Sequence, residues 1–339
     1  MSGRESRRFF LQGAASGVLL PAEPPGEAGE DFWRGVRRRF SFTEERVPMN
    51  AANLCPSPRV VADRVAELTR DIDADCSLQN REKFHRMLEE SRRMVAAQLR
   101  VSADELALVR NTSEANNIIN NGLPLVPGDE VVLWDQNHPT NNVAWDVRSA
   151  RFGIVVKRVA TPKSPSGIDE LVNVFERAFG PRTRVLAVTH VSNTSGIRLP
   201  VRELCAAAHQ RGIYVHVDGA QSWGALNTNL RDLGCDSCSA SAHKWFCGPK
   251  EAGILYVRAD KIAGIWPNTV APGWGDDATP DVLGARKFES LGQRDAARPG
   301  TERGRVRGGI ELRRPAAGRR SPRSHTPREW RYGGPRRSR

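Results

Sequence analysis

Short apolar segments alternate with segments of helical character between residues 106 and 257, and this alternation restricts the fold more than any other feature. Segments such as Val201–Gln210 carry apolar side chains at helical spacing, as do residues 81–99 before the first apolar segment. The expected strands are Leu106–Val109, Val131–Trp134, Ile154–Val159, Val185–Thr189, Ile213–Val217, Ser237–Ala240 and Gly253–Val257. This order predicts an α/β fold with a mostly parallel seven-stranded sheet between helices. Ligands of such sheets bind at the carboxyl ends of the strands.

The positive charge is concentrated at one end of the chain. Of the net charge of +12 over 339 residues, residues 298–339 account for +11, with 14 Arg, no Lys and 3 Glu. The first 297 residues are therefore nearly neutral and give no reason to expect a nucleic-acid partner. No run of about 18 apolar residues occurs, so no membrane-spanning helix is expected.

Both ends of the chain differ in composition from the part between them. Residues 1–22 contain SRRFFLQGAASGVLLPA, which predicts a twin-arginine signal and a periplasmic or exported protein; a disordered basic N-terminus of a cytoplasmic protein is the alternative. Residues 23–46 are expected to be a linker or an N-terminal arm. Residues 298–339 are Arg-, Gly- and Pro-rich and predict a disordered segment. It is either an interaction tail or, as we favour, the product of a frameshift near residue 297.

Polar side chains follow several of the expected strands. In RNTSEANN, Thr112 and Ser113 open a helix, where hydroxyls and free backbone N–H groups can bind a phosphate. In DQNHPTNN, the imidazole of His138 could lie flat against an aromatic ring. In HVDGAQSWG, Asp218 could hold the protonated nitrogen of a heteroaromatic ring. Taken singly, each residue also fits an ordinary structural role, such as capping a helix.

Lys244 lies in SASAHKWF, between small residues and an aromatic pair. A lysine is costly to bury, and small neighbours let a bulky ligand approach its amine. With Ser241 and His243 beside it, and with the groups above, the chain has the parts needed to hold pyridoxal 5'-phosphate. Lys244 would form the Schiff base and later act as a general base, while Asp218 would keep the pyridine nitrogen protonated.

The six cysteines do not predict a metal site. Cys235 and Cys238 form a single CxxC, without a second pair or nearby histidines. We interpret them as small residues of a buried strand, with a redox role as the alternative.

These motifs resemble, in sequence and order, the aminotransferase class V family of fold-type I pyridoxal-phosphate enzymes. The family includes cysteine desulfurases, selenocysteine lyases and isopenicillin N epimerase-like proteins. The most specific match is HVDGAQSWG followed, 26 residues after Asp218, by Lys244 in SAHKW. The stretches RNTSEANN, NHPTNN and THVSNTSGIRLP match in the same order, and the resemblance covers roughly residues 47–297.

The resemblance implies a role for each matching residue. The cofactor-binding positions of the family correspond here to Thr112, Ser113, His138, Asn193, Asp218, Gln221, Ser241, His243 and Lys244. The hydroxyl residues and His243 would contact the phosphate, and His138 would stack on the ring. Asn193 would lie near the phenolic oxygen or the substrate, and Gln221 would make a second ring contact. Lys244, Asp218 and His138 are the expected catalytic residues. The loop around Trp274 implies a homodimer, because in relatives it completes the neighbouring subunit's site.

The chain departs from the family after RKFESLGQRD, where relatives continue into a C-terminal small domain. That domain is expected to be lost here, and with it the arginine that binds the substrate carboxylate and the sulfur-accepting cysteine of desulfurases. Transamination, epimerisation and C–S cleavage therefore remain open, although MNAANLCPSP and LGQRD favour the epimerase-like branch. We predict an enzyme acting on an amino acid. A non-catalytic remnant and a nucleic-acid-binding protein that uses the Arg-rich tail are the alternatives.

Overall fold

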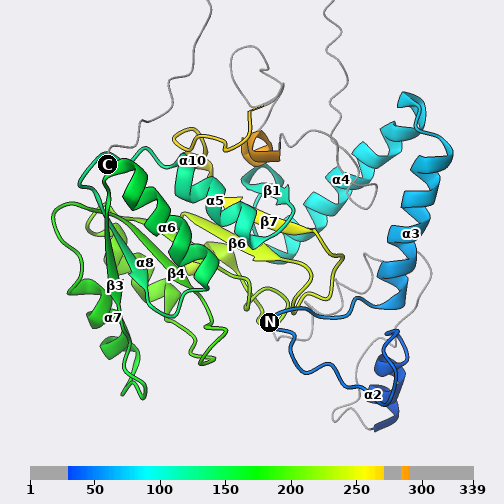
Figure 1. Ribbon diagram of the computed structural model, residues 1–339, viewed down its shortest axis with the longest axis horizontal. Helices are drawn as coiled ribbons and strands as arrows, with labels where there is room; N and C mark the ends of the chain where they lie inside the picture. The colour runs from blue at the N-terminus through cyan, green and yellow to red at the C-terminus, as the bar shows by residue number, and fades with distance from the viewer. Residues whose placement is uncertain (1–29, 271–283, 290–339) are drawn as a thin grey trace, which may run out of the picture. The chain divides into compact units, whose positions relative to one another are not determined.

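A seven-stranded sheet forms the main element of the computed structural model, which describes residues 30–270 and 284–289 (Figure 1). The expected signal in residues 1–22, the loop around Trp274 and the tail of residues 298–339 lie outside the described residues. None of the described helices combines the length and the apolar character that crossing a bilayer requires.

The sheet confirms the strand assignment, and its strand boundaries differ from the expected ones by at most two residues. The strands are β1 (Leu106–Val109), β2 (Glu130–Trp134), β3 (Val155–Val159), β4 (Thr183–Thr189), β5 (Tyr214–Asp218), β6 (Ser237–Ser241) and β7 (Gly253–Val257). Their spatial order is β1-β7-β6-β5-β4-β2-β3. Strand β7 is antiparallel to both of its neighbours, and the other described pairs are parallel. The carboxyl ends of β1, β2, β4, β5 and β6 therefore meet at one edge.

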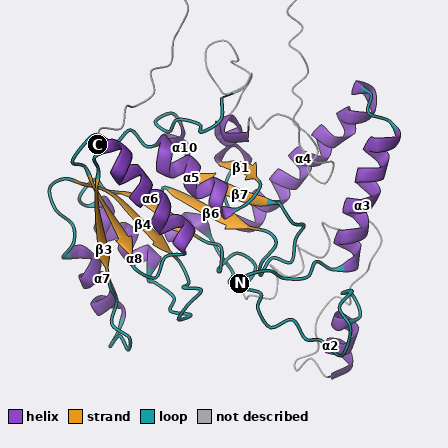
Figure 2. Ribbon diagram, viewed as in Figure 1, coloured by secondary structure: helices purple, strands orange, loops and turns teal. Residues whose placement is uncertain are grey.

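Helices cover both faces of the sheet (Figure 2). The longer helices are α2 (Glu30–Arg37), α3 (Arg59–Ala74), α4 (Leu78–Leu99), α5 (Thr112–Gly122), α6 (Pro139–Phe152), α7 (Ile168–Glu176) and α8 (Val201–His209). The short ones are η1 (Ala103–Glu105), α9 (Leu230–Leu233), α10 (Ala259–Ile262) and η2 (Gly284–Glu289).

Two separate apolar clusters show which helix lies on which face. One contains residues of α5 and α6, including Ile119 and Trp145, with one set of alternating strand residues. The other contains residues of α4, α7 and α8, including Leu99 and Phe175, with the opposite set. This division follows from the two-residue period of a strand, which sends successive side chains to opposite faces of the sheet. Because both faces are covered, the strand-end residues are left as the accessible part of the parallel strands.

The ends of α4 are set by local capping. The Ser77 side chain accepts a hydrogen bond from the Asn80 N–H at the first turn, and Arg100 takes up a left-handed conformation after the last. The helical pattern read from residues 81–99 is confirmed, and the helix starts three residues earlier because Ser77 provides the cap.

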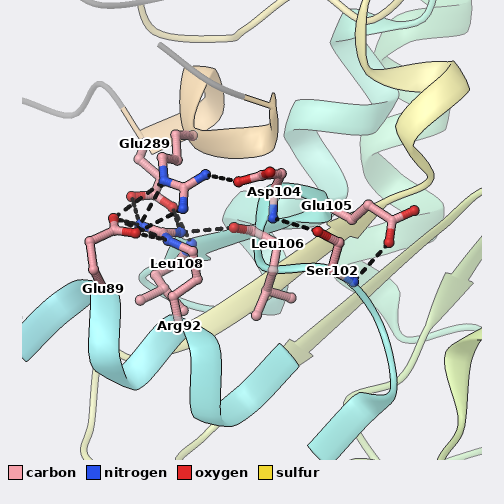
Figure 3. Close-up of polar contacts among 9 residues, drawn as sticks. Glu89, Arg92, Ser102, Asp104, Glu105, Leu106, Leu108 and Glu289 are labelled. Atoms are coloured by element: carbon pink, nitrogen blue, oxygen red, sulfur yellow. Dashed lines mark hydrogen bonds and ion pairs between the residues drawn. The ribbon is translucent and has the colours of Figure 1, made fainter. Parts of the chain in front are cut away.

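A buried network of charges attaches η2 to the first strand (Figure 3). The Arg92 guanidinium is fully buried; it pairs with Glu289, lies 3.0 Å from an oxygen of Glu89, and donates to the Leu106 carbonyl at 2.8 Å. Glu289 accepts from the Leu108 N–H at 2.7 Å. The network therefore joins α4, β1 and η2 immediately before the turn that carries Thr112.

Candidate active site

The turn between β1 and α5 brings two of the expected phosphate ligands together. Asn111 caps α5 by accepting the Glu114 N–H at 2.9 Å. The next residue, Thr112, donates its N–H to the Ser241 hydroxyl at 2.8 Å, and the two hydroxyl oxygens lie 2.7 Å apart. The turn fits closely over β7, because a Cβ on Gly253 would lie 2.8 Å from the Asn111 Cα. The paired hydroxyls thus lie at the positive end of the α5 dipole, where an anion is stabilised.

Asp218 ends β5 as a buried carboxylate with two fixed donors. Its Oδ1 accepts the Ala220 N–H at 3.0 Å, and its Oδ2 accepts the Asn116 side-chain amide, also at 3.0 Å. A carboxylate oxygen has more than one lone pair, so each oxygen can accept a further hydrogen bond. The structure therefore holds Asp218 in one orientation and leaves it acceptor capacity for a ring N–H.

Asn116 is a site residue that sequence reasoning missed. Besides donating to Asp218, its Oδ1 accepts from the Ser239 hydroxyl and lies 2.9 Å from His216 Nε2. Because that oxygen can only accept, His216 carries its proton on Nε2, and its Nδ1 accepts from Ser237 at 2.7 Å. Burial lowers the pKa of His216 to about 3, so the imidazole is neutral. The available signal was the position of Asn116 one helical turn after Thr112.

Asn116→Ala should loosen Asp218 and weaken cofactor binding. The change leaves Asp218 Oδ2, His216 and Ser239 without their shared partner, which costs about 1–3 kcal/mol of unfolding free energy for each buried group that stays unsatisfied. Loss of a residue that orients a metal ligand typically costs about 10–100-fold in affinity, and Asn116 orients Asp218 in the same way. We therefore expect the Kd for pyridoxal phosphate to rise by that factor, measured by titration of the absorption spectrum.

Asn121→Ala is the matched control, because Asn121 is an exposed asparagine on the same helix. It should leave the Kd and the free energy of unfolding unchanged. Equal effects of the two variants would show that Asn116 does not position Asp218.

Lys244 lies partly buried in the loop after β6. Within the described residues its amine forms no hydrogen bond or ion pair, although the negative charge of Asp218 acts on it. Burial lowers the pKa of the Lys244 amine below its usual value, and Asp218 opposes the shift. The amine and the carboxylate thus belong to one electrostatic site without neutralising each other by direct contact.

The aromatic pair after Lys244 fastens this loop to the loop after β5. The Trp245 indole N–H donates to Gln221 Oε1 at 2.7 Å. Phe246 stacks on Trp223, with ring centroids 3.9 Å apart and planes 19° from parallel. Gly224 allows the close approach: its φ is +89°, and a Cβ would lie 2.4 Å from the Phe246 nitrogen. The aromatic pair therefore holds Lys244 beside the Asp218 loop.

His138 reaches the same site from β2. Its Nδ1 accepts the Thr140 N–H at 3.3 Å, so the residue caps α6. The preceding Asn137 attaches this turn to the end of β4, donating to the Ala187 carbonyl at 2.9 Å and accepting the Thr189 N–H at 2.7 Å. Burial and the charge of Lys244 lower the pKa of His138, with Asp218 opposing. A neutral imidazole can lie against a ring without adding positive charge.

The positions of the remaining expected ligands say less about a role in cofactor binding. Ser113 is half-buried at the start of α5, and Asn193 is exposed in the loop after β4. The His243 carbonyl accepts the Cys55 N–H at 2.8 Å, so its backbone role is structural. Both ends of the Gln221 side-chain amide are hydrogen-bonded, since its Oε1 accepts from Trp245 and its Nε2 donates to the Ala52 carbonyl at 2.9 Å. Its expected contact with the ring stays a prediction.

The two cysteines of the CxxC are buried, and Cys238 lies in β6, as interpreted from the sequence. Burial is the largest cause that raises the pKa of Cys235, to about 12, which disfavours its thiolate. Among the described residues, no cluster of three or more His, Cys, Asp or Glu side chains could hold a metal ion.

The site fits pyridoxal phosphate in the chemistry of its donors. It combines paired hydroxyls at a helix start for a phosphate, a buried carboxylate for a ring nitrogen, a neutral imidazole and an amine that pairs with no described carboxylate. Substrate or cofactor would approach along the carboxyl edge of the sheet, where these groups lie.

Comparison with known proteins agrees with this description. The profile of the aminotransferase class-V family matches residues 51–273. The chain is 32% identical over 248 residues to isopenicillin N epimerase of Amycolatopsis lactamdurans, an alignment that covers 72% of this chain and 62% of the epimerase. It is also 32% identical over 251 residues to a probable cysteine desulfurase of Methanothermobacter thermautotrophicus, covering 73% of this chain and 61% of that protein.

The fold is also similar to that of a solved structure. A solved structure of C-DES with glycine covalently linked to its PLP cofactor superimposes with a TM-score of 0.70 at 23% identity, covering 78% of this chain and 70% of that one. The chain spans about three fifths of the length of the epimerase and of the probable cysteine desulfurase. With the family profile matching most of the described residues, the chain belongs to the aminotransferase class-V family of fold-type I pyridoxal-phosphate enzymes.

Proposed function

We propose that the protein is a pyridoxal-phosphate enzyme that removes a proton from the Cα of an amino acid. Lys244 supplies the amine that holds the cofactor, and Asp218 is the partner of its ring nitrogen. One observation carries the proposal: the charge of Asp218 acts on Lys244 at the carboxyl edge of the sheet, yet the two groups form no ion pair within the described structure. That arrangement suits a ligand placed between them.

Each residue has a task that its surroundings support. When bound, the cofactor would draw electrons from the substrate Cα. Thr112 and Ser241 would bind the phosphate at the start of α5, and neutral His138 would lie against the ring. The Lys244 Nζ would accept the Cα proton. Because a lowered pKa increases the fraction of neutral amine at neutral pH, burial makes this lysine a better base.

The reaction we propose is epimerisation of an amino-acid centre. The similarity to isopenicillin N epimerase supports it. Cysteine desulfurase activity is the second candidate, supported by equal identity to the probable cysteine desulfurase. A homodimer also remains a prediction, since the loop around Trp274 that suggested it lies outside the described residues.

Cofactor binding can be tested on the full chain. We expect added pyridoxal phosphate to give a visible absorption band that borohydride removes. After reduction and digestion, mass spectrometry should locate the cofactor on the peptide that contains Lys244. Absence of the band, or a cofactor spread over several lysines, would contradict the proposal.

The reaction is then distinguished by two product assays. Inversion of isopenicillin N, detected by chiral chromatography without sulfide release, would support epimerisation. Sulfide released from L-cysteine would favour the desulfurase. Bound cofactor with neither product, including over a wider amino-acid panel, would favour the non-catalytic alternative.

A further inference from the structure

Two free cysteines lie in contact beside the lysine-bearing loop. Cys55 Sγ and Cys247 Sγ are 3.4 Å apart, although 192 residues separate them in the sequence. A disulfide needs an S–S distance of about 2.05 Å, so the sulfurs must approach by only about 1.4 Å. Both residues are half-buried, which leaves them partly accessible to a small molecule.

The backbones on either side of the thiol pair are already joined. The Cys55 N–H donates to the His243 carbonyl at 2.8 Å, and the Ser57 hydroxyl donates to the Gly248 carbonyl at 2.8 Å. The Lys250 ammonium donates to the Cys55 carbonyl at 3.3 Å and to the Ser57 hydroxyl at 3.0 Å. A bond between the sulfurs would therefore add to an existing contact between residues 51–57 and residues 243–250.

The conformation of Cys247 is unusual for a residue with a β-carbon. Its φ is +56°, in the left-handed region, and its N–H donates to the Lys244 carbonyl at 2.9 Å. The tight turn after Lys244 thus places the Cys247 thiol against Cys55. The other four cysteines have no such arrangement: Cys76 is exposed, and Cys205, Cys235 and Cys238 are buried.

We infer that Cys55 and Cys247 form a reversible disulfide that fastens the N-terminal residues 51–57 to the loop carrying Lys244. The oxidant is a low-molecular-weight disulfide such as oxidised glutathione. The inference does not depend on the proposed function, because it concerns two thiols and not the cofactor.

The reaction proceeds by two exchange steps. The thiolate of one cysteine attacks the small disulfide, forms a mixed disulfide and releases one small thiolate. The thiolate of the second cysteine then attacks the sulfur of the first, forms the intramolecular bond and releases a second small thiolate. Two electrons pass from the protein to the oxidant, and the two protons lost by the cysteines end on the two small thiols.

The surroundings make this exchange slow at neutral pH. Burial, with the neighbouring Cys55 thiol, raises the pKa of Cys247 to about 12, while the ammonium of Lys250 acts in the opposite direction. Because the thiolate is the attacking species, we expect the rate to rise with pH.

The test uses the folded, full-length chain incubated with oxidised glutathione at mildly alkaline pH. After denaturation and alkylation, free thiols should fall from six to four. Mass spectrometry should find one linked pair of peptides, containing Cys55 and Cys247, that dithiothreitol separates. Since the bond closes a very long loop, the Tm should rise by roughly 5 °C or more and return on reduction.

Two variants complete the test. Cys76→Ser should form the same bond, because Cys76 is exposed in the turn between α3 and α4 and is not one of the two sulfurs in contact. Cys55→Ser should instead leave glutathione attached to Cys247 or leave Cys247 free. The inference is overturned if the wild-type chain keeps glutathione on either cysteine without the linked peptides, if both thiols stay alkylatable, or if the linked form has an unchanged Tm.

Discussion

Lys244→Ala should lower amino-acid turnover by about 1,000-fold or more and remove the borohydride-trapped cofactor. The variant loses both the amine that holds the cofactor and the base that accepts the Cα proton, and a general base alone is typically worth about 100–10,000-fold. The amine makes no hydrogen bond within the described residues, so its removal should change the Tm little. Turnover, trapping and Tm are measured on the same preparation.

Two further variants separate the roles of Lys244. Lys244→Arg keeps the positive charge, but a guanidinium does not lose its proton in proteins, so this variant should be as inactive as the alanine variant. Lys163→Ala is the control, since Lys163 is an exposed lysine in the loop before α7. Retention of turnover by Lys244→Ala would rule out the proposed site. Activity in Lys244→Arg would show that only charge is needed.

Arg92→Leu should strongly destabilise the described fold. It removes the fully buried guanidinium and leaves the buried Glu289 carboxylate without its main charged partner (Figure 3). Breaking a buried pair in this way costs about 3–5 kcal/mol of unfolding free energy. For a chain of this size that loss lowers the Tm by roughly 10 °C. Urea unfolding at pH 7, followed by circular dichroism, measures it.

The matched control is Arg93→Leu, at the next and exposed position of α4, which should change stability by less than about 0.5 kcal/mol. The double variant Arg92→Leu/Glu289→Leu should recover part of the loss, because the buried carboxylate that faced Arg92 is then removed as well. If Arg92→Leu unfolds at the same urea concentration as Arg93→Leu, the network does not hold η2 in place.

The same network should make the free energy of unfolding depend on pH in the acidic range. Burial would raise the pKa of Glu89, but hydrogen bonds and charge from Arg286 and Arg92 outweigh it and lower the pKa to about 2. A carboxyl group with a lowered folded-state pKa stabilises the protein above its unfolded pKa, near 4.5, and loses that contribution as the pH falls towards 2. In Arg92→Leu, the free energy of unfolding should therefore decrease less between pH 4.5 and pH 2 than in the wild-type chain.

Much of the fold could be predicted because its signals are local. The short apolar segments between helical ones predicted the ends of the seven strands to within two residues, and apolar residues at helical spacing predicted α4 and α8. The polar residues Thr112, His138 and Asp218 were recognisable because each lies at the end of an apolar strand or within four residues after it. The parallel arrangement then brought their strand ends to one edge, as the general rule for such sheets requires.

The sequence by itself therefore determined the order of the elements and the residues at their ends, since both depend on neighbours within a few positions. Only the tertiary structure decided the pairings across long separations: Asn116 with Asp218, 102 residues apart, Cys55 with Cys247, 192 apart, and Arg92 with Glu289, 197 apart. The physical reason is that a periodic pattern records which face of an element is buried. The pattern does not record which polar group from a distant part of the chain contacts that buried face, because this depends on how the packed elements align their side chains.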